Sequence, residues 1–530
     1  MVVLFAWAYP THFLIADEVA YFEQAIEWAG ASPSVISDYP PGTALVAAGL
    51  IGLFGPKAVF LCGIGAFLVG IWALAGMLCR LDKPVVWALY PALFLPGLVL
   101  TRTLMSDLPS FALACIFLRL YIQPTGQPVN QSTSQPINLS TSQPVNQPTS
   151  HPANQSPLFA AGLVAGLSVL FRETNLLWAL PFLVGAVWRA RGNPTPNPSP
   201  EGEGSYIQTY LKYFMSGCIH SQTRIIQIIR DVAPLPPGGG VGGGVVWLGF
   251  IIGFLPRPAW GWFSFGDPFF VRDSGIAFSV AYLPQNLSFY LFALLVLMPG
   301  GLYFLVRNKS PYRWETTASV LLFLGVYGCY GYDAFTKSGW KGLVLQGRFL
   351  LPLLPFVALA AAETMPVVGR GLRYGIAAAT VLLFAGVQFV GHAYNLEQQR
   401  ITDALLRLPA GEHLTFTPDE SRKYLNALHT PRLTTSSRLT SAEPLIICRT
   451  TGSRPTNPAP TQNSKPKTQN CYAHLITRSD SADRIKKTAE AETAFQRYFH
   501  GAKTTLLTDL TIRDGTRLRI WRIRQTDHNE

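Results

Sequence analysis

A succession of long apolar stretches is the feature that most restricts how this chain can fold. A helix crosses the hydrocarbon core of a bilayer with about 20 mostly apolar residues. Stretches near that length lie at 57–79, 84–101, 107–122, 158–171, 174–189, 245–257, 286–306, 316–333, 348–365 and 373–391. With a shorter stretch within residues 1–16, they predict an all-α polytopic membrane protein with about 10 or 11 transmembrane helices.

The composition supports this interpretation and excludes other classes. Only 14% of the residues are charged and 49% are hydrophobic, whereas a soluble chain carries about 25% charged residues. The net charge of +12 does not indicate nucleic-acid binding, because the Lys and Arg residues fall between apolar blocks rather than in basic runs with aromatic residues.

Three segments have too biased a composition to form a packed core. Residues 123–157, 193–244 and 449–470 are rich in Pro, Gln, Asn, Ser, Thr or Gly, so we interpret them as inserted connectors. The first two interrupt a membrane domain of residues 1–391. The third interrupts a more polar domain of residues 392–530.

The polar C-terminal domain is expected to be a small α/β unit. Short alternations of apolar and polar residues at 413–417, 444–448 and 516–524 predict strands, and a stretch near 480–499 predicts a helix. Cys448 and Cys471 flank the third insert, and the sequence leaves open whether they form a disulfide or remain two free thiols.

The distribution of Lys and Arg predicts the orientation in the membrane. Alternating the spans places four basic loops on one face, which is therefore expected to be cytoplasmic. These loops contain Arg80 and Lys83; Arg189 and Arg191; Arg307, Lys309 and Arg313; and Arg370 and Arg373. We predict a multi-pass protein of the plasma (inner) membrane, with residues 392–530 on the extracytoplasmic side. The acids expected on that side are Asp17, Glu18, Glu23, Glu27, Asp38, Asp107, Asp267 and Asp273.

Two acidic motifs fall on that extracytoplasmic face. Asp17 and Glu18 directly follow the first apolar stretch, at the start of an amphipathic helix that includes Tyr21, and Asp107 heads the span at 107–122. Carboxylates at the membrane surface are costly unless they are solvated or used. The alternative interpretation is a solvated helix start for Asp17 and Glu18 and an N-cap for Asp107.

Basic residues on the same face are candidate partners of an anion. Arg172 lies between two apolar stretches and needs an anion or a carboxylate, for which Glu173 is the nearest in sequence. Arg348 opens a span shortly after Lys341, where snorkelling to the interface is the alternative. Upstream of Arg172, Gly162 and Gly166 predict a closely packed helix pair.

Taken in chain order, these motifs resemble those of polytopic glycosyltransferases of the GT-C fold, in the group that includes protein O-mannosyltransferases and aminoarabinose transferases. The matching motifs are Asp17-Glu18-x-x-Tyr21; Tyr39-Pro40-Pro41-Gly42 with Leu53-Phe54-Gly55; Ser106-Asp107-x-Pro109; Gly166-x-x-x-x-Phe171-Arg172-Glu173; and Gly347-Arg348-Phe349-Leu350-Leu351-Pro352. The resemblance covers residues 1–390 outside the inserts. No Walker glycine loop, HExxH, paired CxxC or nucleophile elbow competes with it.

The resemblance implies a sugar donor linked to polyprenyl phosphate, a glycan, lipid or protein acceptor on the extracytoplasmic face, and inversion at the anomeric carbon. It implies Asp17 as general base, with Glu18 and Asp107 either supporting the site or holding a divalent cation together with Asp17. The implied substrate-binding residues are Tyr21, Tyr39, Arg102, Arg172, Lys341 and Arg348. Some relatives carry a Lys before the Pro-Pro pair, where this chain has Tyr39.

A carrier or flippase for a lipid-linked glycan or solute is the alternative function. Transporters also bury charges in the membrane, but usually near the midplane, within broken helices and internal repeats. The acids of this chain cluster at one surface, and no convincing two-fold repeat is present. The pattern therefore favours an enzyme that works at the membrane surface, surrounded by membrane lipid.

Overall fold

The computed structural model describes most of the membrane domain and the strands of the C-terminal domain. The described residues are 1–14, 16–30, 39–122, 156–190, 241–268, 270, 277–331, 339–406, 412–416, 433–435, 445–449, 471–478, 493, 503–511 and 516–524. The helix expected near 480–499 and all three inserts fall almost entirely outside them.

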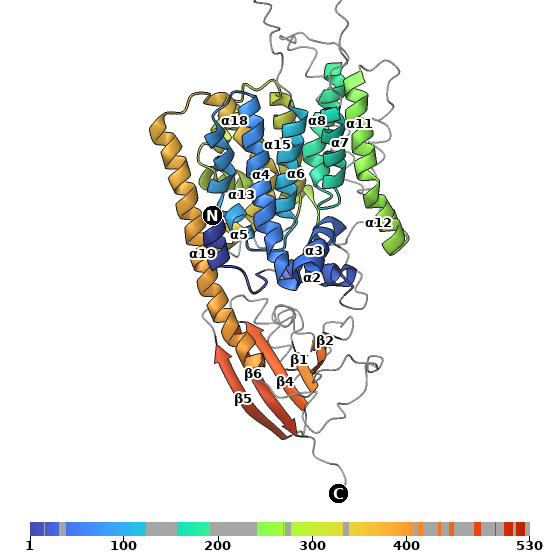
Figure 1. Ribbon diagram of the computed structural model, residues 1–530, viewed down its shortest axis with the longest axis vertical. Coiled ribbons are helices and arrows are strands. Elements are labelled where there is room, and N and C mark those ends of the chain that lie inside the picture. The colour runs from blue at the N-terminus through green and yellow to red at the C-terminus, as the bar shows by residue number, and fades with distance from the viewer. Residues whose placement is uncertain are drawn as a thin grey trace, which may run out of the picture.

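Helices dominate residues 1–406, and strands make up what is described of the remainder (Figure 1). The α-helices are α1 Val2–Trp7, α2 Ala16–Trp28, α3 Pro41–Phe54, α4 Leu61–Arg80, α5 Leu95–Leu100, α6 Asp107–Tyr121, α7 Ser156–Ser168, α8 Asn175–Ala190, α11 Val241–Phe254, α12 Pro256–Phe265, α13 Leu283–Leu297, α14 Gly301–Val306, α15 Arg313–Gly328, α17 Gly339–Gly347, α18 Leu354–Thr364 and α19 Arg370–Leu406. Short 3₁₀ segments are η1 Pro56–Phe60, η2 Val85–Leu93, η3 Val280–Tyr282 and η4 Arg348–Leu353.

Four continuous helical stretches are long and apolar enough to cross a membrane. Among the described residues these are Pro56–Arg80, Val280–Leu297, Gly342–Thr364 and Arg370–Arg400, and Pro41–Phe54, Ser156–Ser168 and Asn175–Arg189 are shorter apolar helices. A membrane protein with a mostly helical bundle is therefore confirmed. The count of 10 or 11 crossings stays a prediction.

Two of the expected spans are broken helices. Residues 84–101 form η2 and then α5, with the break at Phe94, where Pro91 and Pro96 interrupt the hydrogen-bond ladder. Residues 286–306 likewise divide into α13 and α14 at Gly300, which has φ +81°. The first apolar stretch is shorter than expected, because α1 ends at Trp7, close to Pro10.

Glycines allow the backbones of α7 and α11 to pack in direct contact. A Cβ on Gly162 would come within 2.8 Å of Phe250 N, and one on Gly166 within 2.6 Å of Phe254 N. Gly249 and Gly253 of α11 meet the α7 backbone in the same way. The close packing predicted from the Gly-x-x-x-Gly spacing is thus confirmed, with a matching glycine pair on the partner helix.

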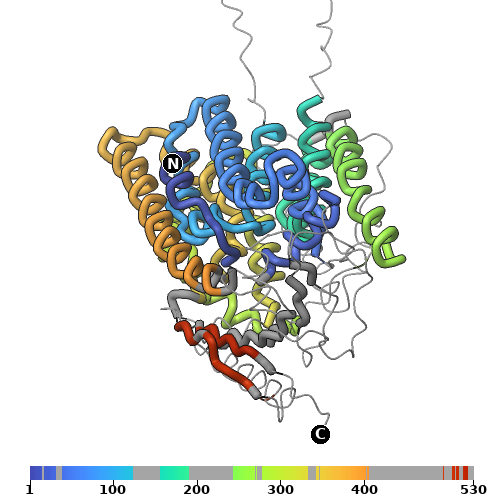
Figure 2. Tube along the Cα trace, turned by 60° about the horizontal axis from the view of Figure 1, so that its bottom comes forward, coloured from blue at the N-terminus to red at the C-terminus, as the bar shows by residue number. Residues whose placement is uncertain are grey.

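The helix α19 leaves the bundle and leads to the C-terminal sheet. It contains 37 residues, about 55 Å at 1.5 Å per residue, and lies on the opposite side of the bundle from α11 (Figure 2). The domain boundary expected at 391 therefore falls inside a continuous helix. We call the end of the bundle that faces the sheet the site end, and the other end the far end (Figure 1).

The C-terminal strands form one sheet of order β2-β3-β1-β4-β6-β5. Its strands are β1 Glu412–Phe416, β2 Leu433–Thr435, β3 Leu445–Arg449, β4 Cys471–Arg478, β5 Lys503–Thr511 and β6 Thr516–Arg524. All neighbouring pairs are antiparallel except β1 and β4. The three expected strands correspond to β1, β3 and β6.

The register of the sheet argues against a disulfide between Cys448 and Cys471. Both residues pair with Glu412, one from each side of β1. Two strand spacings separate their Cα atoms by about 10 Å, whereas a disulfide needs a separation of about 4.4–6.8 Å.

Candidate functional site

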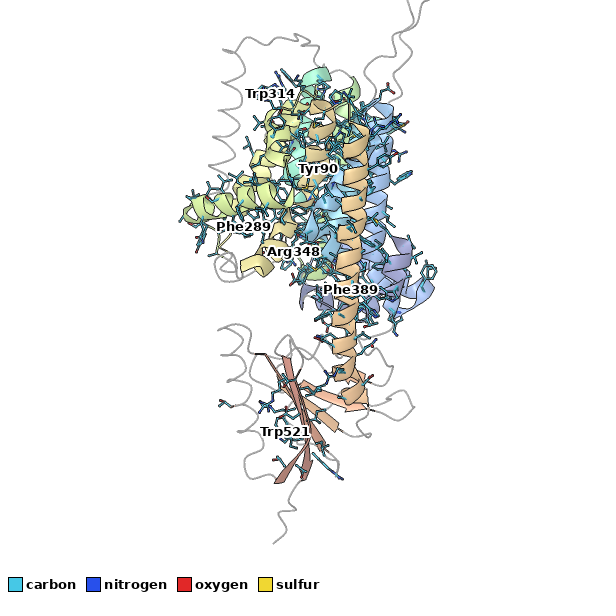
Figure 3. The ribbon with its side chains drawn as sticks, turned by 90° about the vertical axis from the view of Figure 1, so that its left-hand side faces the viewer. Tyr90, Phe289, Trp314, Arg348, Phe389 and Trp521 are labelled. Atoms are coloured by element: carbon cyan, nitrogen blue, oxygen red, sulfur yellow. The ribbon has the colours of Figure 1, made fainter. Side chains whose placement is uncertain are left out.

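Two pairs of a carboxylate and an arginine meet at the site end of the bundle. Asp107, the first residue of α6, forms a close ion pair with Arg172 from the turn between α7 and α8. Asp17, in the first turn of α2, faces Arg348 of η4, with 3.5 Å between Oδ2 and Nη2. Figure 3 places Arg348 in the site-end half of the bundle, with Trp314 at the far end.

Two aromatic residues connect the pairs. The guanidinium carbons of Arg172 and Arg348 lie 4.9 Å and 5.2 Å from the ring centroid of Phe349, so one ring receives two cations. Tyr21 is hydrogen-bonded to Ser106 and lies in the electrostatic field of Arg172 and both aspartates, and its burial raises the pKa of its phenol. The two ion pairs are therefore linked through shared neighbours, and the common role of Asp17 and Asp107 stays a prediction.

Tyr39 connects Asp17 to the Pro-Pro turn. Its hydroxyl donates to Asp17 Oδ1 at 2.7 Å, and its ring lies 5.0 Å from that of Tyr21. Three residues on, Gly42 donates its backbone N–H to Leu170 O at 2.8 Å, and a Cβ there would come within 2.8 Å of the Phe171 ring. A glycine is needed at this point because the turn docks on the segment that carries Arg172.

Glu18 has a different environment from Asp17, although the two are adjacent. Its side chain is fully buried, and its two oxygens accept hydrogen bonds from Leu14 N at 2.7 Å and Leu104 N at 2.9 Å. Because residue 104 lies just before α6, this carboxylate attaches the start of α2 to the start of α6. These two hydrogen bonds therefore join two helix starts, and the role of Glu18 in the site stays a prediction.

Arg102 lies apart from the two ion pairs. Its guanidinium is buried and donates to Ala8 O and, at 2.9 Å, to Gln388 Oε1, which connects α1 to α19. Burial lowers the pKa of Arg102 to about 10. The arrangement is that of a helix clamp, and the predicted contact with substrate has no support in these contacts.

Arg172 and Glu173, which are adjacent in sequence, do not pair with each other. Arg172 pairs with Asp107, whereas Glu173 pairs with Arg257 of α12, 2.7 Å away. Arg257 is 5% exposed and also donates to Phe270 O at 2.7 Å. Its Nε and Nη1 atoms have no hydrogen-bond partner among the described residues.

Sequence reasoning missed Arg257. The available signal was an arginine just beyond a short apolar stretch, in the run Pro256-Arg257-Pro258 at the end of the span at 245–257. Arg257 comes shortly after the last residue of α11, as Arg172 comes shortly after the last residue of α7. The two glycine-packed helices thus deliver two arginines to the site end.

The remaining predicted residues are only partly placed. Lys341 belongs to α17, but its side chain lies outside the described residues. Asp38 and Asp273, two of the acids expected on the extracytoplasmic face, lie wholly outside them. Within the described chain no three His, Cys, Asp or Glu residues gather into a metal site. Asp17, Glu18 and Asp107 face an arginine, two amides and an arginine respectively, so they do not fit a shared divalent cation.

The three predicted acids differ in how far their side chains are exposed. The side chain of Asp17 is 36% exposed, whereas that of Asp107 is 1% exposed and Glu18 is fully buried. Arg348 is mostly buried, and its Nε atom has no partner among the described residues. Of the three predicted acids, Asp17 is therefore the accessible one, and it lies beside the guanidinium of Arg348, which retains an unused N–H donor.

No protein-family model and no curated protein sequence matches the chain. The structure is similar to the crystal structure of ArnT from Cupriavidus metallidurans in the apo state, with a TM-score of 0.47 and 12% sequence identity, over 98% of this chain and 96% of that chain. The structure of the same protein bound to undecaprenyl phosphate gives a TM-score of 0.44 at 12% identity and the same coverage.

Proposed function

We propose that this chain is a membrane glycosyltransferase that moves a sugar from a polyprenyl-phosphate donor to an acceptor on the extracytoplasmic side, with inversion. The observation that carries the proposal is the exposure of Asp17 beside Arg348, with Tyr39 fixing its other oxygen. The GT-C-like motifs assign a base to this position, and it is the accessible one of the three acids.

The proposed reaction is a single displacement at the anomeric carbon. Asp17 accepts the proton of the acceptor hydroxyl or amine, whose lone pair forms the new glycosidic bond as the bond to the phosphate oxygen breaks. The attack comes from the face opposite the leaving phosphate, which inverts the configuration. Since holding the two reactants in line supplies much of the rate enhancement, an ordinary carboxylate suffices as base.

Guanidinium groups are the proposed partners of the donor phosphate. Arg348 and Arg257 both retain buried N–H donors without a partner among the described residues, and arginine forks match phosphate oxygens. Stabilising the charge that develops on the departing polyprenyl phosphate is their contribution to catalysis. Arg172, paired with Asp107 and held on Phe349, would orient Arg348 through the shared ring.

The test uses membranes or purified full-length chain incubated with labelled polyprenyl-phosphate sugars, followed by mass analysis of the labelled products. Asp17→Asn should reduce transfer about 100-fold or more, as expected for loss of a general base. Glu27→Gln, an equivalent change on the same helix, is the control and should remain active. Full activity of Asp17→Asn would remove Asp17 as base.

Two further outcomes separate the alternatives. Comparing the anomeric configuration of donor and product by NMR tests inversion, and a retained configuration would exclude a single displacement. Movement of the lipid-linked sugar across liposomes without any glycosidic product would instead support a carrier.

A further inference from the structure

A second cationic feature lies at the far end of the bundle, away from the candidate active site. The helix α6 begins at Asp107, and Arg119 lies 12 residues on, about 18 Å further along the axis. It meets α4 near the last residue of that helix, Arg80. Neither arginine takes part in the chemistry proposed above.

The side chain of Arg119 is held in a notch on the surface of α4. Its guanidinium carbon lies 4.0 Å from the ring centroid of Trp72, and a Cβ on Gly76 would come within 2.9 Å of that same carbon. The missing side chain at Gly76 therefore makes room for the cation. Arg80 approaches from the next turn and donates to Arg119 O at 3.3 Å.

This notch lies beside an exposed apolar face of α4. Leu68, Val69 and Trp72 are 36%, 43% and 63% exposed, and they share one side of α4 with Gly76 and Arg80 because they follow helical spacing. The stretch Pro56–Arg80 is long and apolar enough to span the membrane. Gly76 lies one turn, about 6 Å, inside the end of that span.

Among the described residues, no acid pairs with either of these two arginines. Elsewhere at the far end, Lys83 pairs with Glu363 at 2.9 Å and Arg189 pairs with Glu315. By contrast, Arg80 and Arg119 form no ion pair with any described residue, and Arg119 Nη1 is buried without a hydrogen-bond partner there. A cation next to hydrocarbon is costly unless an anion or water reaches it.

We propose that Arg119, Arg80 and Trp72 form a binding site for the headgroup of an anionic phospholipid in the leaflet at the far end. Its phosphate would accept hydrogen bonds from the two guanidinium groups. Its acyl chains would lie along Val69 and Leu68, and Trp72 would sit at the interface between them. Two cations favour a headgroup with net negative charge over a zwitterionic one. This proposal does not depend on the proposed function.

The experiment measures lipid binding by the purified full-length chain in detergent. Thermal unfolding and native mass spectrometry are followed with added phosphatidylglycerol, phosphatidylcholine or inorganic phosphate. Of these three additives, only phosphatidylglycerol should raise the Tm and remain bound to the protein in the mass spectrum. An equal effect of phosphatidylcholine would refute the preference for negative charge, and an equal effect of inorganic phosphate would show a free-anion site instead.

Variants assign the effect to this site. Arg119→Gln and Arg80→Gln should each lose most of the Tm rise and the bound phosphatidylglycerol. Arg80 is exposed, so its variant keeps the test valid if Arg119→Gln does not fold. The matched control is Arg313→Gln, which removes another arginine lying over a tryptophan at the far end, 5.3 Å from the ring of Trp314. The proposal is wrong if Arg80→Gln binds phosphatidylglycerol as wild type does, or if Arg313→Gln loses it equally.

Discussion

Replacing the carboxylate by an amide should have different effects at the adjacent acids Glu18 and Asp17. It should lower the stability of the protein at Glu18 and its transfer activity at Asp17. Glu18→Gln keeps the shape of the side chain but replaces one acceptor oxygen by an NH₂ group. That group cannot accept the hydrogen bond from Leu14 N or Leu104 N, whichever it faces. A buried backbone donor is then left unsatisfied, and the remaining bond loses its charge.

The magnitude follows from the two bonds. A hydrogen bond to a charged group contributes about 1.5–3 kcal/mol, and an unsatisfied buried donor costs about 1–3 kcal/mol. We expect Glu18→Gln to lower the free energy of unfolding by about 2–4 kcal/mol. Asp17→Asn changes a side chain that is 36% exposed, and exposed ion pairs contribute about 0–1 kcal/mol, so its stability should stay close to that of wild type.

The assay is thermal unfolding of the purified variants in one detergent, with transfer activity measured on the same samples. Glu18→Gln should unfold several degrees below wild type, while Asp17→Asn should keep its Tm and lose activity. The control Glu27→Gln should keep both. If Glu18→Gln unfolds at the wild-type temperature, the buried carboxylate does not hold α2 to α6, and the reasoning about the two acids fails.

Three other substitutions test separate parts of the structure. Gly166→Ala should cost about 1–3 kcal/mol by overpacking, because its Cβ would meet the backbone of α11, whereas Gly65→Ala has open space within 4 Å and should unfold as wild type does. Arg102→Gln should release α1 from α19, seen as faster proteolysis near the N-terminus; unchanged cleavage would contradict the clamp. Arg257→Gln should raise the KM for the lipid-linked donor about tenfold or more. It should also lower the Tm, because the bonds to Glu173 and Phe270 are lost, and an unchanged KM would remove Arg257 from the phosphate site.

The elements that could be predicted from sequence are those set by local pattern. Apolar length located the helices, although it could not show that Pro91 and Pro96 divide one expected span into η2 and α5. The spacing of Gly162 and Gly166 predicted a tight helix contact. It could not identify α11 as the partner, because the matching glycines lie beyond an insert.

The site was predictable as a group of residues but not as a set of pairs. The alternation of the spans and the distribution of Lys and Arg predicted that Asp17, Asp107, Arg172 and Arg348 lie at one end of the bundle. Which acid meets which arginine depends on how the helix ends are rotated, so neighbours in sequence such as Arg172 and Glu173 take different partners. Arg102 illustrates the same limit, since its partner Gln388 is 286 residues away.

The glycine contact between α7 and α11 also bears on the tolerance of this chain for added sequence. The segments at 123–155 and 191–240 connect helix ends that all lie at the far end. Since the backbone contact itself sets the register of α7 and α11, that register does not depend on the length of either segment. Doubling the length of a loop costs only about 0.6 kcal/mol in closure entropy. Stretches of arbitrary composition can therefore accumulate there while Arg172 and Arg257, roughly 20 Å away at the opposite helix ends, keep their positions.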